Sequence, residues 1–154
     1  MTEKIDIISL GAGVQSSTML MMADRGEIKI DDQVVIPKYA IMSDTGNEPK
    51  KVYEWLSYLQ SKVRNIEIVV TQNGNIVEDI LNGIKNNERF ASVPFFTKSK
   101  DGKKGILRRQ CTSEYKIMAV RKELRRLLGY APRQRVKEQI RLWIGISTDE
   151  IQRV

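Results

Sequence analysis

The 154-residue chain contains no histidine and only one cysteine, Cys111. Without histidine, the commonest general base and the commonest metal ligand are both missing. Catalysis by this chain would therefore use carboxylates, lysine, arginine, hydroxyls, the thiol or a metal bound through oxygen. A single cysteine also excludes an internal disulfide framework and a self-contained four-cysteine iron–sulfur cluster, and it fits a reducing cytoplasm.

Long hydrophobic runs are absent as well. No segment approaches the roughly 18 apolar residues that a membrane span needs, and the first residues, Met-Thr-Glu-Lys, lack the pattern of a signal peptide. At this length the chain is expected to form one domain, residues 1–154, with a real core. We therefore expect a cytoplasmic protein with no membrane association.

Negative charge is scarce in one part of the chain. Residues 98–141 hold 15 lysines and arginines against 4 acidic residues, while the rest of the chain is net negative and the whole is +7. Such asymmetry indicates a polyanionic partner: the phosphates of a nucleotide, nucleic acid or another acidic partner. The alternative is a solvated basic face with no partner.

The opening segment is the most informative stretch. Residues 5–10 are rich in β-branched and apolar side chains, as in a buried parallel strand. Gly11 and Gly13 follow, and Ser16 and Ser17 open an apolar run that predicts a helix. A strand, a glycine loop and a helix start direct unpaired backbone amides at one spot, which suits a phosphate. The alternative is a tight strand–helix turn with serine caps and no ligand.

Strands and helices alternate along the rest of the chain. Further strands are predicted at residues 39–42, 66–70 and 141–146, and helices begin near Pro49, Ile76 and Thr112. This order predicts an α/β fold: a doubly wound, Rossmann-like parallel sheet of about four to five strands with helices on both faces. Residues 86–110 interrupt it as a basic insertion loop that could close over a substrate. Its aromatic residues are expected to form satellite core: Phe90, Phe95 and Phe96.

The segment Ser9-Leu10-Gly11-Ala12-Gly13-Val14-Gln15-Ser16-Ser17 resembles the PP-loop of the adenine nucleotide alpha-hydrolase-like superfamily. The usual form is Ser-Gly-Gly-x-Asp-Ser after a first strand. Gly13 and Ser16 match it, whereas Gly11, Ala12 and Gln15 stand in the positions of the serine, the first glycine and the aspartate. The resemblance implies a nucleotide-phosphate cradle made by Ser9, Gly11, Ala12, Gly13, Gln15, Ser16 and Ser17.

Two later motifs resemble the phosphoadenylylsulfate (PAPS) reductase-like family. They are Met42-Ser43-Asp44-Thr45-Gly46-Asn47-Glu48, and Arg109-Gln110-Cys111-Thr112 followed by Lys116. The resemblance implies that Ser43, Asp44, Thr45 and Gly46 lie beside the nucleotide. It also implies a group that holds the distal phosphate or sulfate: Arg108, Arg109, Cys111, Lys116 and Arg153.

The end of the last predicted strand resembles the family's Gly-Ile-Arg-x-Asp-Glu motif. Here the motif begins at Gly145 and Ser147 replaces the arginine. Asp149 and Glu150 would act with Lys116 in catalysis and could hold Mg²⁺, although the residues alone do not identify a metal. Relatives of this type continue beyond this point, so we expect an abbreviated member that lacks part of the substrate site. Family reductases attack with a cysteine near the C-terminus, so Cys111 is not expected to be a reductive nucleophile.

These features favour a PAPS reductase-like PP-loop enzyme that acts at the phosphate or sulfate of ATP or PAPS. ATP cleavage between the α- and β-phosphates with adenylyl transfer is an open variant that Gln15 weakens, because its side chain carries no charge to order a metal or a base. The alternatives are an inactive binding module that uses its basic surface on nucleic acid, as in a phage or mobile element, and an inert fragment of a longer enzyme. Whether the chain forms a homo-oligomer is an open question at this point.

Overall fold

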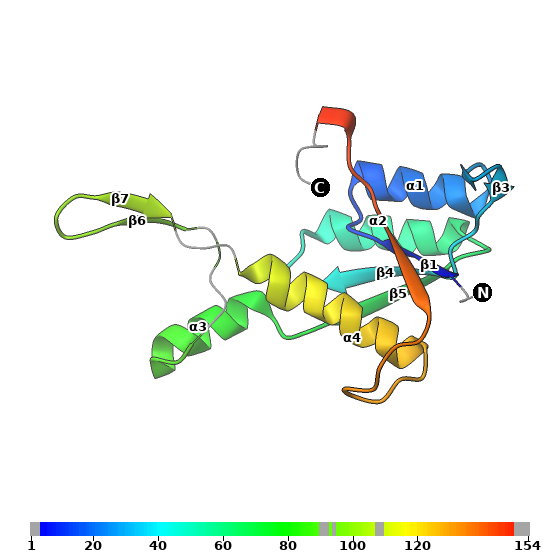
Figure 1. The fold of residues 1–154 in the computed structure, drawn as a ribbon. Coiled ribbons are helices and arrows are strands. Elements are labelled where there is room, and N and C mark those ends of the chain that lie inside the picture. The colour runs from blue at the N-terminus through cyan, green and yellow to red at the C-terminus, as the bar shows by residue number, and fades with distance from the viewer. Residues whose placement is uncertain (1–3, 90–92, 94, 107–109, 150–154) are drawn as a thin grey trace.

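A four-stranded parallel sheet is the centre of the molecule (Figure 1). The structure is a computed structural model that describes residues 4–89, 93, 95–106 and 110–149. The strands are β1 (Lys4–Ser9), β4 (Tyr39–Asp44), β5 (Glu67–Gln72) and β8 (Gln139–Ile144), in the order β5-β4-β1-β8. In β1, Ile8 pairs with Ala40 on one side and with Trp143 on the other. The predicted parallel sheet is confirmed, including the fourth strand beside the first.

Helices cover both faces of this sheet, as predicted. On one face, Ile8 and Leu10 pack in a core with residues of α1 (Val14–Asp24) and α2 (Lys50–Lys62). On the other face, Ile7 packs against Val120 of α4 (Met118–Leu127). This division follows from the alternation of side chains along a strand. A π-helix, η1 (Thr112–Ile117), precedes α4, where the sequence predicted a single regular helix.

Two polar contacts hold α1 and α2 together, one near each end of α1. Near its start, Trp55 Nε1 donates to Ser17 Oγ at 2.9 Å. Near its end, the buried Asp24 carboxylate accepts from the backbone amides of Arg64, Asn65 and Ile66. The glycine loop before α1 is therefore attached to a rigid pair of helices.

Two hairpins lie outside the four-stranded sheet. β2 (Lys29–Ile30) and β3 (Gln33–Val34) form a small one, which the sequence did not predict. β6 (Phe96–Lys98) and β7 (Lys104–Ile106) form the second, within the predicted insertion loop. The prediction that Phe95 and Phe96 are core is wrong, because their exposed fractions are 53% and 88%. Phe90 lies outside the described residues.

α3 (Ile76–Asn86) follows β5 and is capped by Asn75, whose side chain accepts from the amides of Val77 and Glu78. Its apolar residues are only partly buried, since Ile84 is 65% exposed. Within the described residues, no helix combines the length and apolar character needed to cross a membrane.

Candidate functional site

The loop between β1 and α1 presents a run of unpaired backbone amides. The amide of Leu10 still donates to Ile41 of β4 at 2.9 Å, and the first bond of α1 runs from Ser17 to the carbonyl of Gly13 at 3.0 Å. Between them, the amides of residues 11–16 have no acceptor within the part of the chain that the structure describes. Such donors, together with the positive end of the helix dipole, suit an anion.

The glycines of this loop leave free space beside the backbone. A Cβ at Gly11 or at Gly13 would have no neighbour closer than 3.9 Å, and Gly13 has an extended conformation that any residue can adopt. The left-handed position of the loop is instead taken by Ala12, with φ of 52°. Packing and backbone strain within the chain therefore do not require glycine at 11 or 13, and close approach of a ligand gives a reason for it.

Gly145, just after β8, touches the start of α1. A Cβ there would lie 2.6 Å from the backbone nitrogen of Ser16 and 2.8 Å from the carbonyl carbon of Gln15. Any larger residue would push the end of β8 away from the amide run. The predicted motif that begins at Gly145 thus coincides with a site of close backbone packing.

A cavity of about 410 Å³ opens at the carboxyl ends of β1, β4 and β8. In the order β5-β4-β1-β8, the chain winds one way from β1 to β5 and then returns to the other side of β1, so β1 and β8 flank a topological switch point. Open α/β sheets bind ligands at such points, and the volume lies in the range of small-molecule sites. The lining residues are Ser9, Leu10, Gly11, Ile41, Met42, Ser43, Glu48, Thr112, Lys116, Ile117, Val120, Arg121, Leu142 and Ile144.

The π-helix forms one wall of this cavity and is fixed to the sheet. Ser43 Oγ donates to the carbonyl oxygen of Tyr115, and Asn73 Nδ2 donates to that of Glu114 at 2.9 Å. π-Helical turns occur frequently at functional sites. Thr112 lines the cavity, and its buried hydroxyl has no partner among the described residues. A buried hydroxyl of this kind is suited to a polar group of a ligand.

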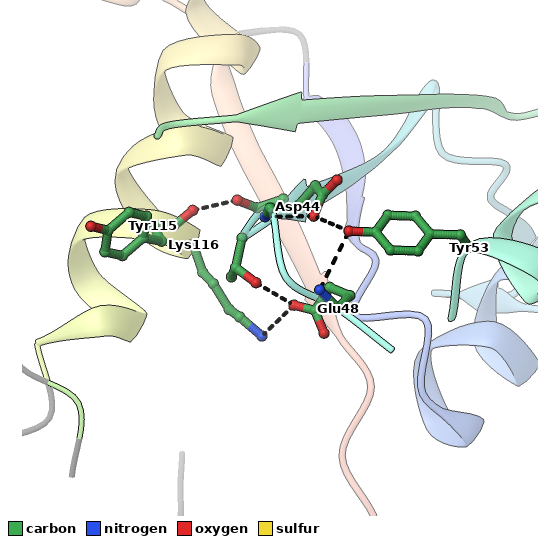
Figure 2. A network of polar contacts seen from close by, with 8 residues as sticks. Asp44, Glu48, Tyr53, Tyr115 and Lys116 are labelled. Carbon is green, nitrogen blue, oxygen red and sulfur yellow. Dashed lines mark hydrogen bonds and ion pairs between the residues drawn. The ribbon is translucent and has the colours of Figure 1, made fainter. Parts of the chain in front are cut away.

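The polar loop after β4 is held by a network of hydrogen bonds (Figure 2). Asp44 Oδ1 accepts from the amide of Gly46 at 2.8 Å and from the Tyr53 hydroxyl at 2.9 Å. Thr45 Oγ1 donates to Glu48 Oε1 at 2.9 Å. The hydrogen bond to Asp44 raises the pKa of Tyr53, so this phenol stays protonated as a donor at neutral pH. The loop therefore has one fixed shape at the cavity mouth.

Gly46 is required by that shape. Its φ is +78°, and a Cβ would lie 2.8 Å from Gln72 Nε2 and 2.9 Å from Asn75 Cγ. Asn75 also donates from Nδ2 to the carbonyl oxygen of Gly46 at 3.3 Å. The start of α3 thus packs against this loop and supports it.

Lys116 adds a cation to this network. Its ammonium group lies 3.9 Å from Glu48 Oε1, and its side chain is half exposed. Figure 2 shows Lys116 and Tyr53 reaching the loop from opposite sides. Because the ion pair is long and partly solvated, the lysine can exchange Glu48 for an incoming anion at little cost.

A second cavity of about 510 Å³ lies on the other side of the glycine loop, between α1 and α2. It is bordered by Ala12, Gly13, Val14 and Ser17 of the first segment and by Trp55 of α2. The loop is therefore bordered by open space on both sides, while the backbone of Gly145 packs against its end at residues 15 and 16.

The structure brings several predicted site residues together and separates others. Ser9, Gly11, Ser43 and Lys116 line one cavity, and Ala12, Gly13 and Ser17 line the other. The serine hydroxyls are already engaged, because Ser16 Oγ donates to Gly13 and Ser17 Oγ accepts from Trp55. Gln15 is exposed, and α1 begins without a serine cap. That these residues bind a ligand is still a prediction.

The predicted carboxylates and arginines are only partly described. Asp149 is exposed, and a hydrogen bond from Ser147 lowers the pKa of its carboxyl group. Cys111 is a half-buried free thiol at the start of η1. The described residues contain no group of three or more metal-ligating side chains. Four predicted residues lie outside the described residues: Arg108, Arg109, Glu150 and Arg153.

Sequence reasoning did not single out several residues that shape the site. Tyr53 and Tyr115 act through their hydroxyls, and Tyr115 donates to Asp79 of α3 at 2.7 Å. Burial and that hydrogen bond raise the pKa of Tyr115. Glu48 was noted only as the end of a motif. Nothing local in the sequence marks these contacts, which join residues up to 36 positions apart.

Comparisons with models of protein families, with curated proteins and with solved structures found no match for this chain.

Proposed function

We propose that the chain binds an adenine nucleotide, ATP or PAPS, at the carboxyl edge of its sheet and acts at the phosphate or sulfate. The observation that carries the proposal is the run of unpaired amides at residues 11–16 beside a cavity at the switch point between β1 and β8. The phosphates would lie on these amides, where a helix start favours negative charge.

The nucleoside would lie in the cavity of about 410 Å³. Its walls are largely apolar, which suits a flat base, while a few polar groups would set the orientation. Of these, the Thr112 hydroxyl is buried without a partner among the described residues. Asp44 accepts from Tyr53 and Gly46 through Oδ1 and does not line the cavity, so it would shape the loop rather than contact the nucleoside itself.

The chemistry would consist mainly of positioning and charge neutralisation. In adenylyl transfer, an acceptor oxygen or nitrogen attacks the α-phosphorus, the bond to the β-phosphate oxygen breaks, and pyrophosphate leaves. The loop amides and Lys116 would stabilise the charge that develops on the leaving group. Asp149 offers carboxylate oxygens that suit Mg²⁺, which would neutralise phosphate charge when bound.

Isothermal calorimetry with ATP, AMP and PAPS, at two salt concentrations, tests the proposal. We expect stoichiometric binding of at least one nucleotide that persists at the higher salt. Gly13→Val should abolish binding without unfolding the chain, because residue 13 is extended and its Cβ would have free space. Heat from none of the three nucleotides, or unchanged binding by Gly13→Val, would contradict the proposal. Pyrophosphate release then tests for turnover.

A charge-matched pair of variants tests the role of Lys116. Lys116→Gln should weaken binding by about tenfold or more, because a hydrogen bond to a charged group is lost. Lys122→Gln removes the same charge from an exposed position on α4 that does not line the cavity, and it should bind as the wild type does. Equal losses of nucleotide affinity in the two variants would mean that the effect comes from the net charge of the protein and not from the position of Lys116.

A further inference from the structure

The hairpin of β6 and β7 extends away from the sheet and its helices, on the side toward which β4 points (Figure 1). Each residue from 95 to 106 is exposed, and Phe96 is 88% exposed. An isolated two-stranded hairpin is marginally stable in water. The hairpin therefore gains little from the core, and its exposed aromatic ring is a cost to the free protein.

One face of the hairpin combines apolar and basic side chains. In the antiparallel register, Phe96 is opposite Ile106 and Lys98 is opposite Lys104. Residues two apart in a strand share a face, so these four side chains lie on the same side. The aromatic–aliphatic pair favours the hairpin, but two like charges directly across from each other oppose it.

The lysines of the hairpin have no ion-pair partner among the described residues. Lys98, Lys100, Lys103 and Lys104 occur with a single acidic residue, Asp101, and none of the four has an ion pair within the described residues. A bound polyanion would relieve their repulsion. Lysines that follow a phosphate backbone, together with an exposed ring on which a base can stack, are the pattern of single-strand binding.

We propose that this hairpin binds single-stranded nucleic acid, with Lys98 and Lys104 on the phosphates and Phe96 stacked on a base. The apolar part of the face is one phenylalanine and one isoleucine, which is small for insertion into a lipid surface, whereas one ring is enough for one base. The proposal is independent of nucleotide binding in the cavity, since none of these side chains lines it.

Fluorescence anisotropy with a labelled oligo-dT of about 20 nucleotides, longer than one typical binding site, tests the proposal. We expect the double variant Lys98→Gln/Lys104→Gln to weaken binding by about tenfold or more at 50 mM salt. It should also flatten the dependence of log affinity on log salt by about 1.4, because two contacts to a single strand are lost. Phe96→Ala should cost about fivefold or more through lost stacking.

The control variant Lys29→Gln/Lys51→Gln removes the same charge from exposed positions in β2 and α2, and it should bind within about twofold of the wild type. Melting temperatures should stay unchanged in all variants, since each altered side chain is exposed. Three results would overturn the proposal: no binding of the wild type at 50 mM salt, an equal loss in the control variant, or binding to phosphatidylserine vesicles but not to the oligonucleotide.

Discussion

Gly145→Ala tests the contact between β8 and the start of α1. The new Cβ would lie 2.6 Å from the backbone nitrogen of Ser16, whereas comfortable contacts begin near about 3.5 Å, so the two segments must separate by about 0.9 Å. Overpacking of this kind costs about 1–3 kcal/mol. Each kcal/mol lowers the melting temperature of a domain of this size by about 2–4 °C. Because the amide of Ser16 moves, nucleotide affinity should fall too.

The matched control is Gly11→Ala. Its Cβ would have no neighbour closer than Ser16 Oγ at 3.9 Å, so the free energy of unfolding should change by less than about 0.5 kcal/mol or rise slightly as the unfolded chain loses entropy. Gly11 lines the cavity, so the same methyl group should still weaken nucleotide binding. Thermal unfolding measures both variants. A Gly145→Ala protein that melts with the wild type, or an equal loss in Gly11→Ala, would refute the reasoning.

Two further changes probe single hydrogen-bonded groups. Tyr53→Phe removes the hydroxyl that donates to Asp44, so urea unfolding should show a loss of about 1 kcal/mol, whereas Tyr58→Phe, with no hydroxyl bond among the described residues, should show none. In β1, hydrogen bonds from Arg141 at 2.5 and 2.8 Å lower the pKa of Asp6 below its ordinary value of 3.8. The stability that the ionised Asp6 contributes is therefore present above about pH 4 and is lost as the pH falls through the lowered pKa. Asp6→Asn should cost about 1–3 kcal/mol at pH 7, and the difference from wild type should shrink below pH 4; a constant difference would speak against this pair.

The fold was largely predictable because each strand of the parallel sheet contains a short apolar segment and is followed by polar or turn-forming residues. The four parallel strands begin and end within a few residues of their predicted positions, and Asp44 lies at the carboxyl end of its strand as expected. The hairpin of β2 and β3 was missed because its strands have two residues each, too few for a periodic signal. Asp31 and Asp32 at its turn both have positive φ.

Phe95 and Phe96 show why burial could not be predicted from hydrophobicity alone. Both are large apolar side chains, but no other element among the described residues covers Phe96, which is 88% exposed. The hydrophobicity of a side chain makes its burial favourable, but it does not identify the element that would cover the side chain. Exposed apolar groups of this kind often mark contact sites.

The details of the site depended on contacts between distant segments. The π-helix replaced the predicted α-helix where the carbonyls of Glu114 and Tyr115 accept from Asn73 and Ser43, at the ends of β5 and β4. Such contacts have no local sequence signal. The glycine loop, in contrast, does have a local sequence signal, because two glycines between a strand and a helix predict unpaired amides. In the structure the amides of residues 11–16 have no partner among the described residues.

The most direct test of the central claim is the amide ¹H–¹⁵N spectrum of the protein during titration with ATP or PAPS. If residues 11–16 form an anion cradle, their amide resonances should shift most, and downfield as they gain an acceptor, together with those of Thr112 and Lys116. Saturable shifts confined to other parts of the chain, with the amides of residues 11–16 unmoved, would contradict the account.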